Sequence, residues 1–398
     1  MKKSIFVFSF AALAIFAQAQ SDMPNDPSWD YYNPLLTGVP SLAINPDAVS
    51  GGMGDIGVST KPGLSDQYWN SSKYAMSESP GGFAISYTPW LRKIVGDIDL
   101  AQIAGFYKIG DDDRAGTLSA SLRYFSLGEV ALRQTAEQTP IIVKPHELAF
   151  DLGYSRKLAE RFSMGVNLRF ISSDLSVQTD ENYFPGYGFA ADINGFYQLP
   201  IELNSGESTF GLGFNISNIG TKISYDKGET SNFIPTTFRL GASYYIPFDK
   251  YNRIAIAAET SRLLVPSRKS KNTIGFDKDD PLTWTMTEKE YSDIGVMKGI
   301  FSSFADAPGG FREEMKEFIW AVGAEYSYNE MFFVRAGYSH ESANKGNRKF
   351  FTVGAGFKWT AFRIDVGYVI AQAANSPVDG ILRFTLAFDA DGLKDLMR

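Results

Sequence analysis

The amino-acid sequence predicts an all-β fold: a transmembrane antiparallel β-barrel of about fourteen strands, with an N-terminal luminal plug and a long, partly helical extracellular loop. Three observations lead to this fold class. Many segments alternate strictly between apolar and polar residues, the polar positions hold small residues and isolated charges, and short connections alternate with long ones. Together these features are typical of outer-membrane barrels.

The alternation is clear between residues 148 and 157. Leu148, Phe150, Leu152 and Tyr154 occupy one face, and Ala149, Asp151, Gly153, Ser155 and Lys157 occupy the other. Successive side chains of a strand point to opposite faces of the sheet, so this pattern predicts one strand with an apolar face.

The composition of the polar faces indicates what surrounds the sheet. They are rich in Gly, Ser and Asn with isolated charges, which suits the inside of a closed barrel better than the surface of a soluble sandwich. A soluble β-sandwich stays open as an alternative, because alternation by itself does not identify the solvent. The charges expected to point inward are Asp151, Arg169, Arg239, Glu259, Arg335, Arg363, Asp365 and Arg383.

The strand count is even, as single-chain bacterial barrels require. It treats 116–133 as one long strand with a bulge or bend at Gly128; splitting it there would give fifteen strands. The expected strands are 83–90, 98–109, 116–133, 146–158, 162–173, 188–199, 209–219, 236–246, 253–263, 319–328, 331–340, 350–360, 362–372 and 381–388.

The connections divide into two kinds that alternate along the chain. In outer-membrane barrels the short turns face the periplasm and the long loops face outward. Both termini of a fourteen-stranded barrel then fall on the short-turn side. The short turns are 110–116, 158–161, 247–252, 329–330 and 360–361, and the long loops are 134–145, 174–187, 220–235, 264–318, 341–349 and 373–380.

The first nineteen residues predict a cleavable secretory signal peptide. Lys2 and Lys3 precede an apolar run at 5–16 and a small-residue exit at 17–19, and the run is too short for a membrane anchor. Cleavage leaves 36 basic and 45 acidic residues, a formal charge of −9 that argues against a nucleic-acid partner. The chain contains no cysteine, which excludes disulfides and thiolate chemistry.

The segment SLAINPDAVSGGMGDIGVS, at 41–59, does not alternate and is built of small residues. Small residues permit close backbone approach, so we expect this segment to fill the lumen as a plug, rather than to hang as a periplasmic tail. The expected domains are 1–19 as signal peptide, 20–82 as periplasmic segment and plug, 83–388 as barrel and 389–398 as periplasmic extension. The predicted plug residues are Asn45, Pro46, Gly51, Gly52, Met53, Gly54 and Asp55.

The loop at 264–318 is far longer than a barrel needs, and loops of this length are commonly functional. Apolar residues at 297, 300, 301 and 304 have helical spacing and predict one apolar stripe. Two interpretations stay open. The stripe packs back over the barrel mouth, or it docks on a partner protein.

Candidates for chemistry are few. His146 and His340 fall near outward strand ends, with Asp151, Glu341 and Ser342 as conceivable partners of a hydrolase site, but no catalytic or metal-binding motif accompanies them. The acidic runs 111–113 and 277–280 are interpreted as a tight turn and as a loop without calcium-binding spacing. We therefore expect no catalytic residues, no cofactor and no metal.

Two stretches carry a resemblance to a known family. TGVPSLAINPDAVSGGMGDIGVSTKPGLSDQYWNSSKYAM (37–76) and NYFPGYGFAADINGFYQ (182–198), behind a signal peptide, resemble the PorV family, also called LptO, of the type IX secretion system. That family is related to the FadL fatty-acid transporters. One departure is WNSSKYA at 69–75, where relatives often have WNPAKYA.

The resemblance implies a non-enzymatic barrel of the cell outer membrane, in contact with outer-membrane lipid. Such a protein binds the C-terminal signal domains of cargo at the type IX translocon barrel and carries them to a cell-surface attachment complex. The alternatives are a FadL-type transporter of long hydrophobic molecules and a lipid A deacylase. The expected partner-binding residues, in the loops 174–187, 220–235 and 264–318, are Tyr183, Phe184, Tyr187, Phe233, Trp284, Met297, Phe301 and Phe304.

Overall fold

The computed structural model describes residues 32–392, apart from 94, 111–114, 133–138, 176–182, 279 and 374–375. The predicted signal peptide, the 111–113 turn and residues 393–398 lie outside the described residues. The part of the chain from Asn33 onward forms one compact unit.

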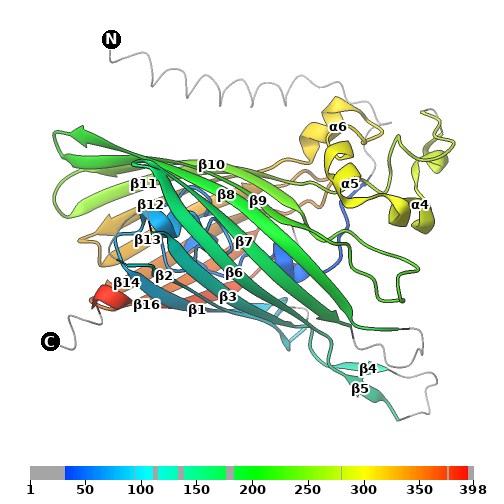
Figure 1. Ribbon diagram of the computed structural model, residues 1–398, viewed down its shortest axis with the longest axis horizontal. Helices are drawn as coiled ribbons and strands as arrows, with labels where there is room; N and C mark the ends of the chain where they lie inside the picture. Colours follow the sequence, from blue (N-terminus) through cyan, green and yellow to red (C-terminus); the bar gives the residue numbers. More distant parts are fainter. Residues whose placement is uncertain are drawn as a thin grey trace. The chain divides into compact units, whose positions relative to one another are not determined.

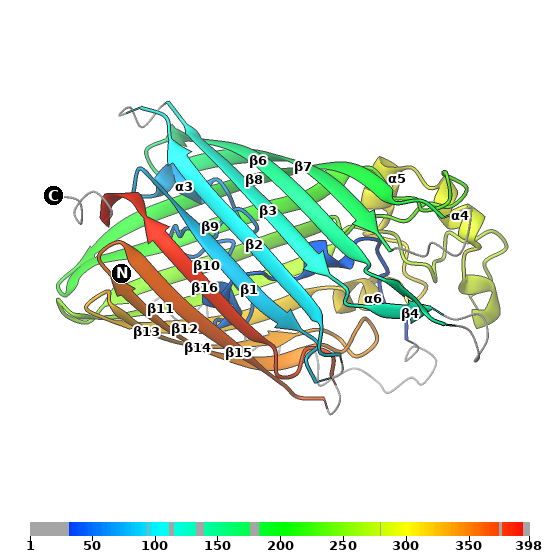
Figure 2. The same ribbon diagram turned by 90° about the horizontal axis from the view of Figure 1, so that it is seen from below.

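Fourteen antiparallel strands close into a barrel, as predicted. Each pairs with its neighbours in the chain, and β1 pairs with β16 from Gly82↔Asp389 to Tyr87↔Phe384 to complete the ring (Figures 1 and 2). The strands are β1 Gly81–Trp90, β2 Ile98–Lys108, β3 Thr117–Ser126, β6 His146–Ala159, β7 Phe162–Asp174, β8 Gly186–Leu203, β9 Gly206–Gly220, β10 Thr237–Pro247, β11 Asn252–Leu263, β12 Ile319–Tyr328, β13 Phe332–His340, β14 Lys349–Trp359, β15 Phe362–Ala371 and β16 Leu382–Asp389.

The prediction of one long strand over 116–133 is wrong. The barrel strand β3 ends at Ser126, and Gly128 follows with φ +82°, a left-handed conformation that turns the chain away from the sheet. Beyond it, β4 (Val130–Leu132) pairs with β5 (Ile141–Val143) as a separate two-stranded sheet. The barrel count stays at fourteen because this ribbon is outside the barrel.

The two faces of the wall differ as the alternation predicted. On β6, Phe150, Leu152 and Tyr154 are exposed on the outside, whereas Asp151 is buried on the inside. The predicted inward charges are buried, except that Arg363 is half-buried. They satisfy one another: Arg169 pairs with Asp151 and Asp192, and Arg335 pairs with Glu325 and Asp365. A soluble sandwich with an apolar interior is therefore excluded.

The connections gather by length at opposite ends of the barrel. Of the described residues, the short-turn end holds 109–110, 115–116, 160–161, 204–205, 248–251, 329–331 and 360–361. The long-loop end holds 91–93, 95–97, 127–132, 139–145, 175, 183–185, 221–236, 264–278, 280–318, 341–348, 372–373 and 376–381. Helices α4, α5 and α6 and the β4–β5 ribbon lie at the long-loop end in both views (Figures 1 and 2). The predicted grouping of short turns at one end and long loops at the other is confirmed.

The described helices are all short. None of them is long and apolar enough to cross a membrane. Before β1 they are η2 Pro40–Ala43, α2 Ala48–Gly51 and α3 Lys73–Met76; between β11 and β12 they are η3 Pro281–Trp284, α4 Glu288–Asp293, α5 Val296–Ser302 and α6 Phe311–Lys316.

Candidate functional site

Residues 33–80 run through the barrel lumen, and we call them the plug. At the long-loop end the Asn33 N–H donates to the Asn344 carbonyl at 2.8 Å. At the short-turn end the Ser163 hydroxyl donates to the Ser72 carbonyl at 2.8 Å, just before β1 begins. The plug therefore descends from the long-loop end. The expectation that this segment enters from the short-turn side is wrong for the described residues, because the loops bind Asn33 at the opposite mouth.

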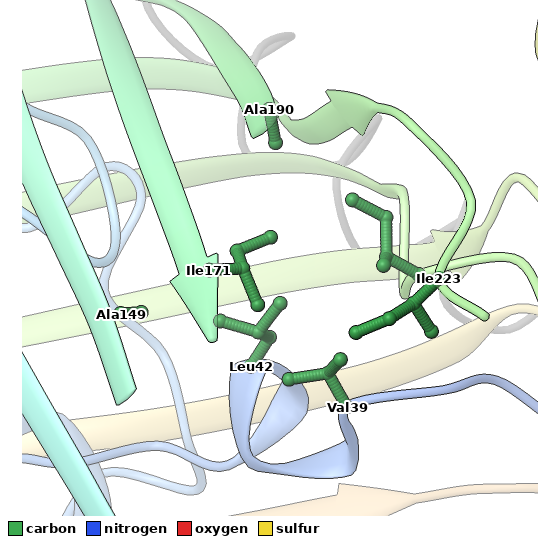
Figure 3. Close-up of a cluster of buried hydrophobic side chains, with 7 residues drawn as sticks. Val39, Leu42, Ala149, Ile171, Ala190 and Ile223 are labelled. Carbon is green, nitrogen blue, oxygen red and sulfur yellow. The ribbon is translucent and has the colours of Figure 1, made fainter. Parts of the chain in front are cut away.

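The upper part of the plug is held by apolar packing. Val39 and Leu42, at the η2 turn, point toward Ile171 of β7 and Ile223 of the 221–236 loop (Figure 3). All four side chains are buried. This cluster fixes the plug against the wall below the long-loop end.

Lower in the lumen, glycines let plug and wall backbones touch. A Cβ placed on Gly337 of β13 would lie 2.2 Å from Gly54 N, and one placed on Gly323 of β12 would lie 2.3 Å from the Met53 carbonyl oxygen. Such distances are impossible for a real side chain, so only glycine fits at these wall positions. The predicted plug residues Asn45, Pro46 and Gly51–Gly54 are buried, and Asp55 is half-buried.

Plug amides also pair with inward side chains of the wall. Gly57 and Val58 donate to Glu259 at 2.9 and 3.0 Å, and Gly54 donates to Thr352 at 2.8 Å. A backbone without its own helix or sheet needs such partners when it is buried. The charges on the inner wall thus serve the plug as well as one another.

The segment between β11 and β12, residues 264–318, forms a structure that we call the loop cap. Its core contains Val265, Met286 and Tyr291, packed with Phe233 of the 221–236 loop. Burial raises the pKa of Tyr291 above its ordinary value. Trp284 is also buried, and its indole N–H donates to the Asp277 carbonyl at 2.7 Å. Phe233 and Trp284, predicted to contact a partner, are thus enclosed inside the cap.

The three aromatic residues around 183–187 lie in different settings. Tyr183 is half-buried and stacks on Tyr225 with ring centres 5.7 Å apart, and burial raises its pKa to about 12. Phe184 is half-buried beneath Lys227, whose ammonium lies 4.4 Å from the ring centre. Tyr187 is exposed on β8.

Helix α5 divides its apolar residues between two faces. Ile300 is buried, so the predicted single stripe over 297–304 is wrong, because Gly299 and Ile300 form the packed side. The remaining apolar side chains are exposed, and α6 adds two more. We call the exposed set the apolar ridge: Met297 (56% exposed), Phe301 (70%), Phe304 (50%), Phe311 (79%) and Met315 (40%).

Ion pairs hold the underside of the ridge to the barrel. Arg262, at the end of β11, contacts Glu314 and Glu317, and its guanidinium lies 4.9 Å from the Phe304 ring centre. Lys345, in the 341–348 loop, contacts Glu313 at 2.6 Å and Glu317 at 2.9 Å. The ridge is therefore presented on a rigid base.

A cavity of about 570 Å³ lies between the plug and the long-loop end of the wall. One side is apolar, with Trp90, Phe125 and Phe350 among its residues. The charged lining residues are five basic and three acidic: Arg239, Arg262, Lys345, Arg348, Arg383, Asp55, Glu259 and Glu341. The cavity thus combines apolar residues with charged ones, and each of its basic residues is ion-paired to a carboxylate.

The histidines do not assemble a hydrolase site. His146 stacks on Tyr124, and Asp151 is bound to Arg169. His340 stacks on Trp320, while Glu341 pairs with Arg348 at 2.8 Å.

Two acids of the run at 277–280, Asp277 and Asp280, serve the fold of the loop. Asp280 accepts a hydrogen bond from the Leu282 N–H at the start of η3, and the Asp277 carbonyl holds Trp284. Sequence reasoning missed another acidic group, Asp306, Glu314 and Glu317, whose carboxylate oxygens lie within 4.8 Å of one another. The only signal of this acidic group in the sequence is the spacing of two glutamates, Glu314 and Glu317, three residues apart.

Comparison with solved structures finds similar barrels. TodX, a toluene transporter of Pseudomonas putida, is 10% identical over 90% of this chain and 98% of that chain, with a TM-score of 0.48. TbuX, a toluene transporter of Ralstonia pickettii, is 11% identical over 86% of this chain and 97% of its own, with a TM-score of 0.43. A FadL homologue of Pseudomonas aeruginosa is 10% identical over 90% and 99%, with a TM-score of 0.42.

Comparison with curated protein sequences gives no match. A family model described as "Type IX secretion system protein PorV" matches residues 30–270, more than half of the 398 residues. This chain belongs to the PorV family of type IX secretion system proteins.

Proposed function

We propose that this protein is a cargo-binding barrel of the type IX secretion system, and that its apolar ridge holds the C-terminal signal domains of cargo proteins. PorV proteins are outer-membrane components of that system and form a non-enzymatic family. In such barrels the long loops face the cell exterior. The ridge is then presented outside the cell, where exported cargo emerges.

One observation carries the proposal. Five large apolar side chains stay exposed, four on the helices α5 and α6 and one, Phe304, just after α5, whereas the opposite sides of the two helices are packed and ion-paired. A surface exposed to water rarely carries such an apolar patch unless the patch binds a partner. Aromatic residues contribute much of the binding free energy at protein interfaces. Lys298 and Arg312 are exposed beside the ridge, so the cargo surface should be apolar with an acidic rim.

The other partners follow from the same placement. The translocon barrel would deliver cargo to the ridge, the attachment complex would receive it, and outer-membrane lipid would surround the exposed Phe150, Leu152 and Tyr154 face. Tyr187 on β8 and the half-buried Tyr183 and Phe184 would form a second contact region.

The test is a co-purification of cargo from outer membranes with the double variant Phe301→Ser, Phe311→Ser. We expect recovered cargo to fall at least about tenfold, since hot-spot aromatics each contribute roughly 2 kcal/mol or more. The matched control is Ile274→Ser, Leu282→Ser, which removes two exposed apolar residues of the same loop cap outside the ridge. Heat-modifiable migration shows that each barrel is folded. Undiminished cargo on the ridge variant would reject the proposal.

A second candidate function is transport of a hydrophobic molecule, and the cavity favours it. Its apolar lining residues, Trp90, Phe125 and Phe350 among them, suit the body of a hydrophobic molecule. Protein-dependent uptake of a radiolabelled long-chain fatty acid would support this function, and equal uptake in a deletion strain would remove it. Lipid A deacylation has weaker support, since the histidines do not contact the acids proposed for them; unchanged lipid A in His146→Ala and His340→Ala strains would end it.

A further inference from the structure

The plug begins inside the loop cap. The Asn33 side chain is buried, and its amide nitrogen donates to the Lys269 carbonyl at 3.1 Å and to the Glu313 carboxylate at 2.8 Å. Lys269 lies in the first part of the loop cap, and Glu313 belongs to α6. The Asn33 N–H donates to the Asn344 carbonyl at 2.8 Å. One plug residue therefore joins the start of the cap, α6 and the 341–348 loop.

The plug residues that follow continue these contacts. Leu35 packs against the core of the loop cap, which contains Tyr291 and Phe233 with ring centres 5.4 Å apart. The Gly38 N–H donates to the Phe233 carbonyl at 2.8 Å. This first stretch of the plug is thus built into the loop cap.

Val39 has a strained backbone at the point where the chain leaves the cap. Its φ of +50° and ψ of +60° lie in the left-handed region, which β-branched residues avoid because the side chain crowds the backbone. The side chain is nevertheless buried, packed with Leu42, Ile171 and Ile223 (Figure 3). Strained conformations persist where the surrounding structure imposes them. The cap contacts before Val39 and the wall contacts after it therefore hold it in a conformation that it would otherwise leave.

We propose that residues 33–39 are a latch that couples the loop cap to the plug. In the latched state Asn33 holds α6 and Val39 stays left-handed. In the unlatched state Val39 returns to a negative φ, and residues 33–38 separate from the cap. Because the latch contacts both parts, the closed upper plug and the arrangement of α6 that presents the apolar ridge stabilise each other. Coupling of this kind is reciprocal between the two parts.

The latch is a property of the fold, whereas its use in secretion rests on the proposed function. Cargo that binds the ridge binds the latched cap, and a ligand stabilises the state that it binds. Bound cargo therefore also holds the upper plug in place. The outer mouth of the barrel then stays sealed while cargo is attached beside it.

The experiment measures opening of the upper plug with a single reporter thiol in the full mature protein, purified from outer membranes in detergent. The chain contains no cysteine, so Leu42→Cys, at a buried position of the plug, introduces one. When reclosing is faster than the chemical step, the rate of its alkylation by a maleimide is proportional to the open population.

The decisive variant loosens α6 from the barrel side. The ion pairs of Arg262 go to Glu314 and Glu317, so Arg262→Ala in the reporter protein should raise the alkylation rate about fivefold or more. Arg253→Ala, from an exposed ion pair, is the matched control and should leave the rate unchanged. Lys345→Ala removes the other cation of α6, and decides the question if Arg262→Ala lacks the heat-modifiable migration of a folded barrel.

A pair of substitutions tests the strain at Val39. Val39→Ala and Val39→Gly both remove the branched side chain, but only glycine adopts the left-handed region without a penalty. In the reporter protein the glycine variant should be alkylated about fivefold more slowly than the alanine variant, the ratio that corresponds to about 1 kcal/mol. Equal rates, or faster alkylation of the glycine variant, would show that Val39 is not strained.

The remaining outcomes separate the latch from the proposed function. A reporter rate unchanged in both Arg262→Ala and Lys345→Ala, or raised equally by Arg253→Ala, overturns the latch. A purified C-terminal signal domain of a cargo protein, bound to the reporter protein, should slow alkylation about fivefold or more; binding without a change in rate overturns the role in secretion. Absence of binding rejects the proposed function, and the latch is then judged on Arg262→Ala alone.

Discussion

Replacing Gly337 by alanine should displace the plug while leaving the barrel closed. The new Cβ would lie 2.2 Å from both Gly54 N and the Met53 carbonyl carbon. Both are backbone atoms, so no side chain can rotate away. The plug must therefore retreat by about 1 Å or more to reach an ordinary van der Waals contact.

The free energy of this retreat follows from the contacts that it breaks. Gly54 would lose its hydrogen bond to Thr352, and a buried donor left unpaired costs about 1–3 kcal/mol. Met53 would lose part of its packing against the wall, worth roughly 1–2 kcal/mol. A total of about 2–5 kcal/mol raises the population with a displaced plug by about 30-fold to several thousand-fold.

Conductance in planar lipid bilayers measures this displacement directly. We expect the wild type to stay closed and Gly337→Ala to conduct small ions. Gly63→Ala is the matched control, because its Cβ would lie 3.8 Å from the nearest atom, within the plug itself. If a folded Gly337→Ala barrel conducted no more than Gly63→Ala, the plug would not close the pore in the way described.

Three further predictions concern the wall, the chain direction and the loop cap. Arg169→Ala leaves Asp151 and Asp192 buried without their cation, and should lower the unfolding free energy in micelles by about 3–5 kcal/mol. The control, Arg253→Ala, removes one member of an exposed ion pair and should lower it by less than about 1 kcal/mol. Similar losses for the two variants would contradict this account. In this cysteine-free chain, Leu36→Cys should react with an impermeant maleimide on intact cells and Lys250→Cys should not; the reverse pattern would invert the assigned orientation. Burial raises the pKa of the Asp306 carboxyl from 3.8 to about 7, so the folded loop cap binds a proton there more tightly than the unfolded chain does. The contribution of this proton to the free energy of unfolding is therefore greatest below pH 4, and it falls by up to about 4 kcal/mol as the pH rises to 7. Proteolysis of the loop cap should thus be faster at pH 8 than at pH 5.5, and an equal pH dependence in Asp306→Asn would count against assigning the effect to Asp306.

The barrel could be predicted from the sequence because its signals are local. Alternation with a period of two follows from the pleat of each strand, so Phe150 and Asp151 reveal their faces without knowledge of any neighbour. Loop lengths likewise show which ends of the strands lie together. The small residues of 41–59 predicted a plug, since only small residues permit the backbone contact made between Gly54 and Gly337.

The candidate site depended on contacts that no local pattern contains. The sequence predicts Phe233 and Trp284 to contact a partner, but both side chains are buried by packing between separate loops. On α5, Ile300 is buried whereas the next residue, Phe301, is exposed. Helical spacing identifies a stripe without showing which part of it meets the wall. For the same reason the sequence could not separate the packing and docking interpretations; the buried Ile300 fits the packing interpretation, and docking by the exposed part of α5 stays a proposal.

The sequence alone therefore determined the barrel, its fourteen strands, its two ends and the presence of a small-residue plug, because each follows from residue periodicity and size. Only the tertiary structure decided that the plug descends from the long-loop end, that 130–132 leaves the barrel after Gly128, and that Arg262, Asp306, Glu314 and Lys345 meet. These features arise from the pairing of charges and backbone groups far apart in the chain. Such pairing is favoured because a charge or a backbone group that is buried without a partner loses its contacts with water at a high free-energy cost. The closed interior that imposes this cost exists only once the barrel has formed.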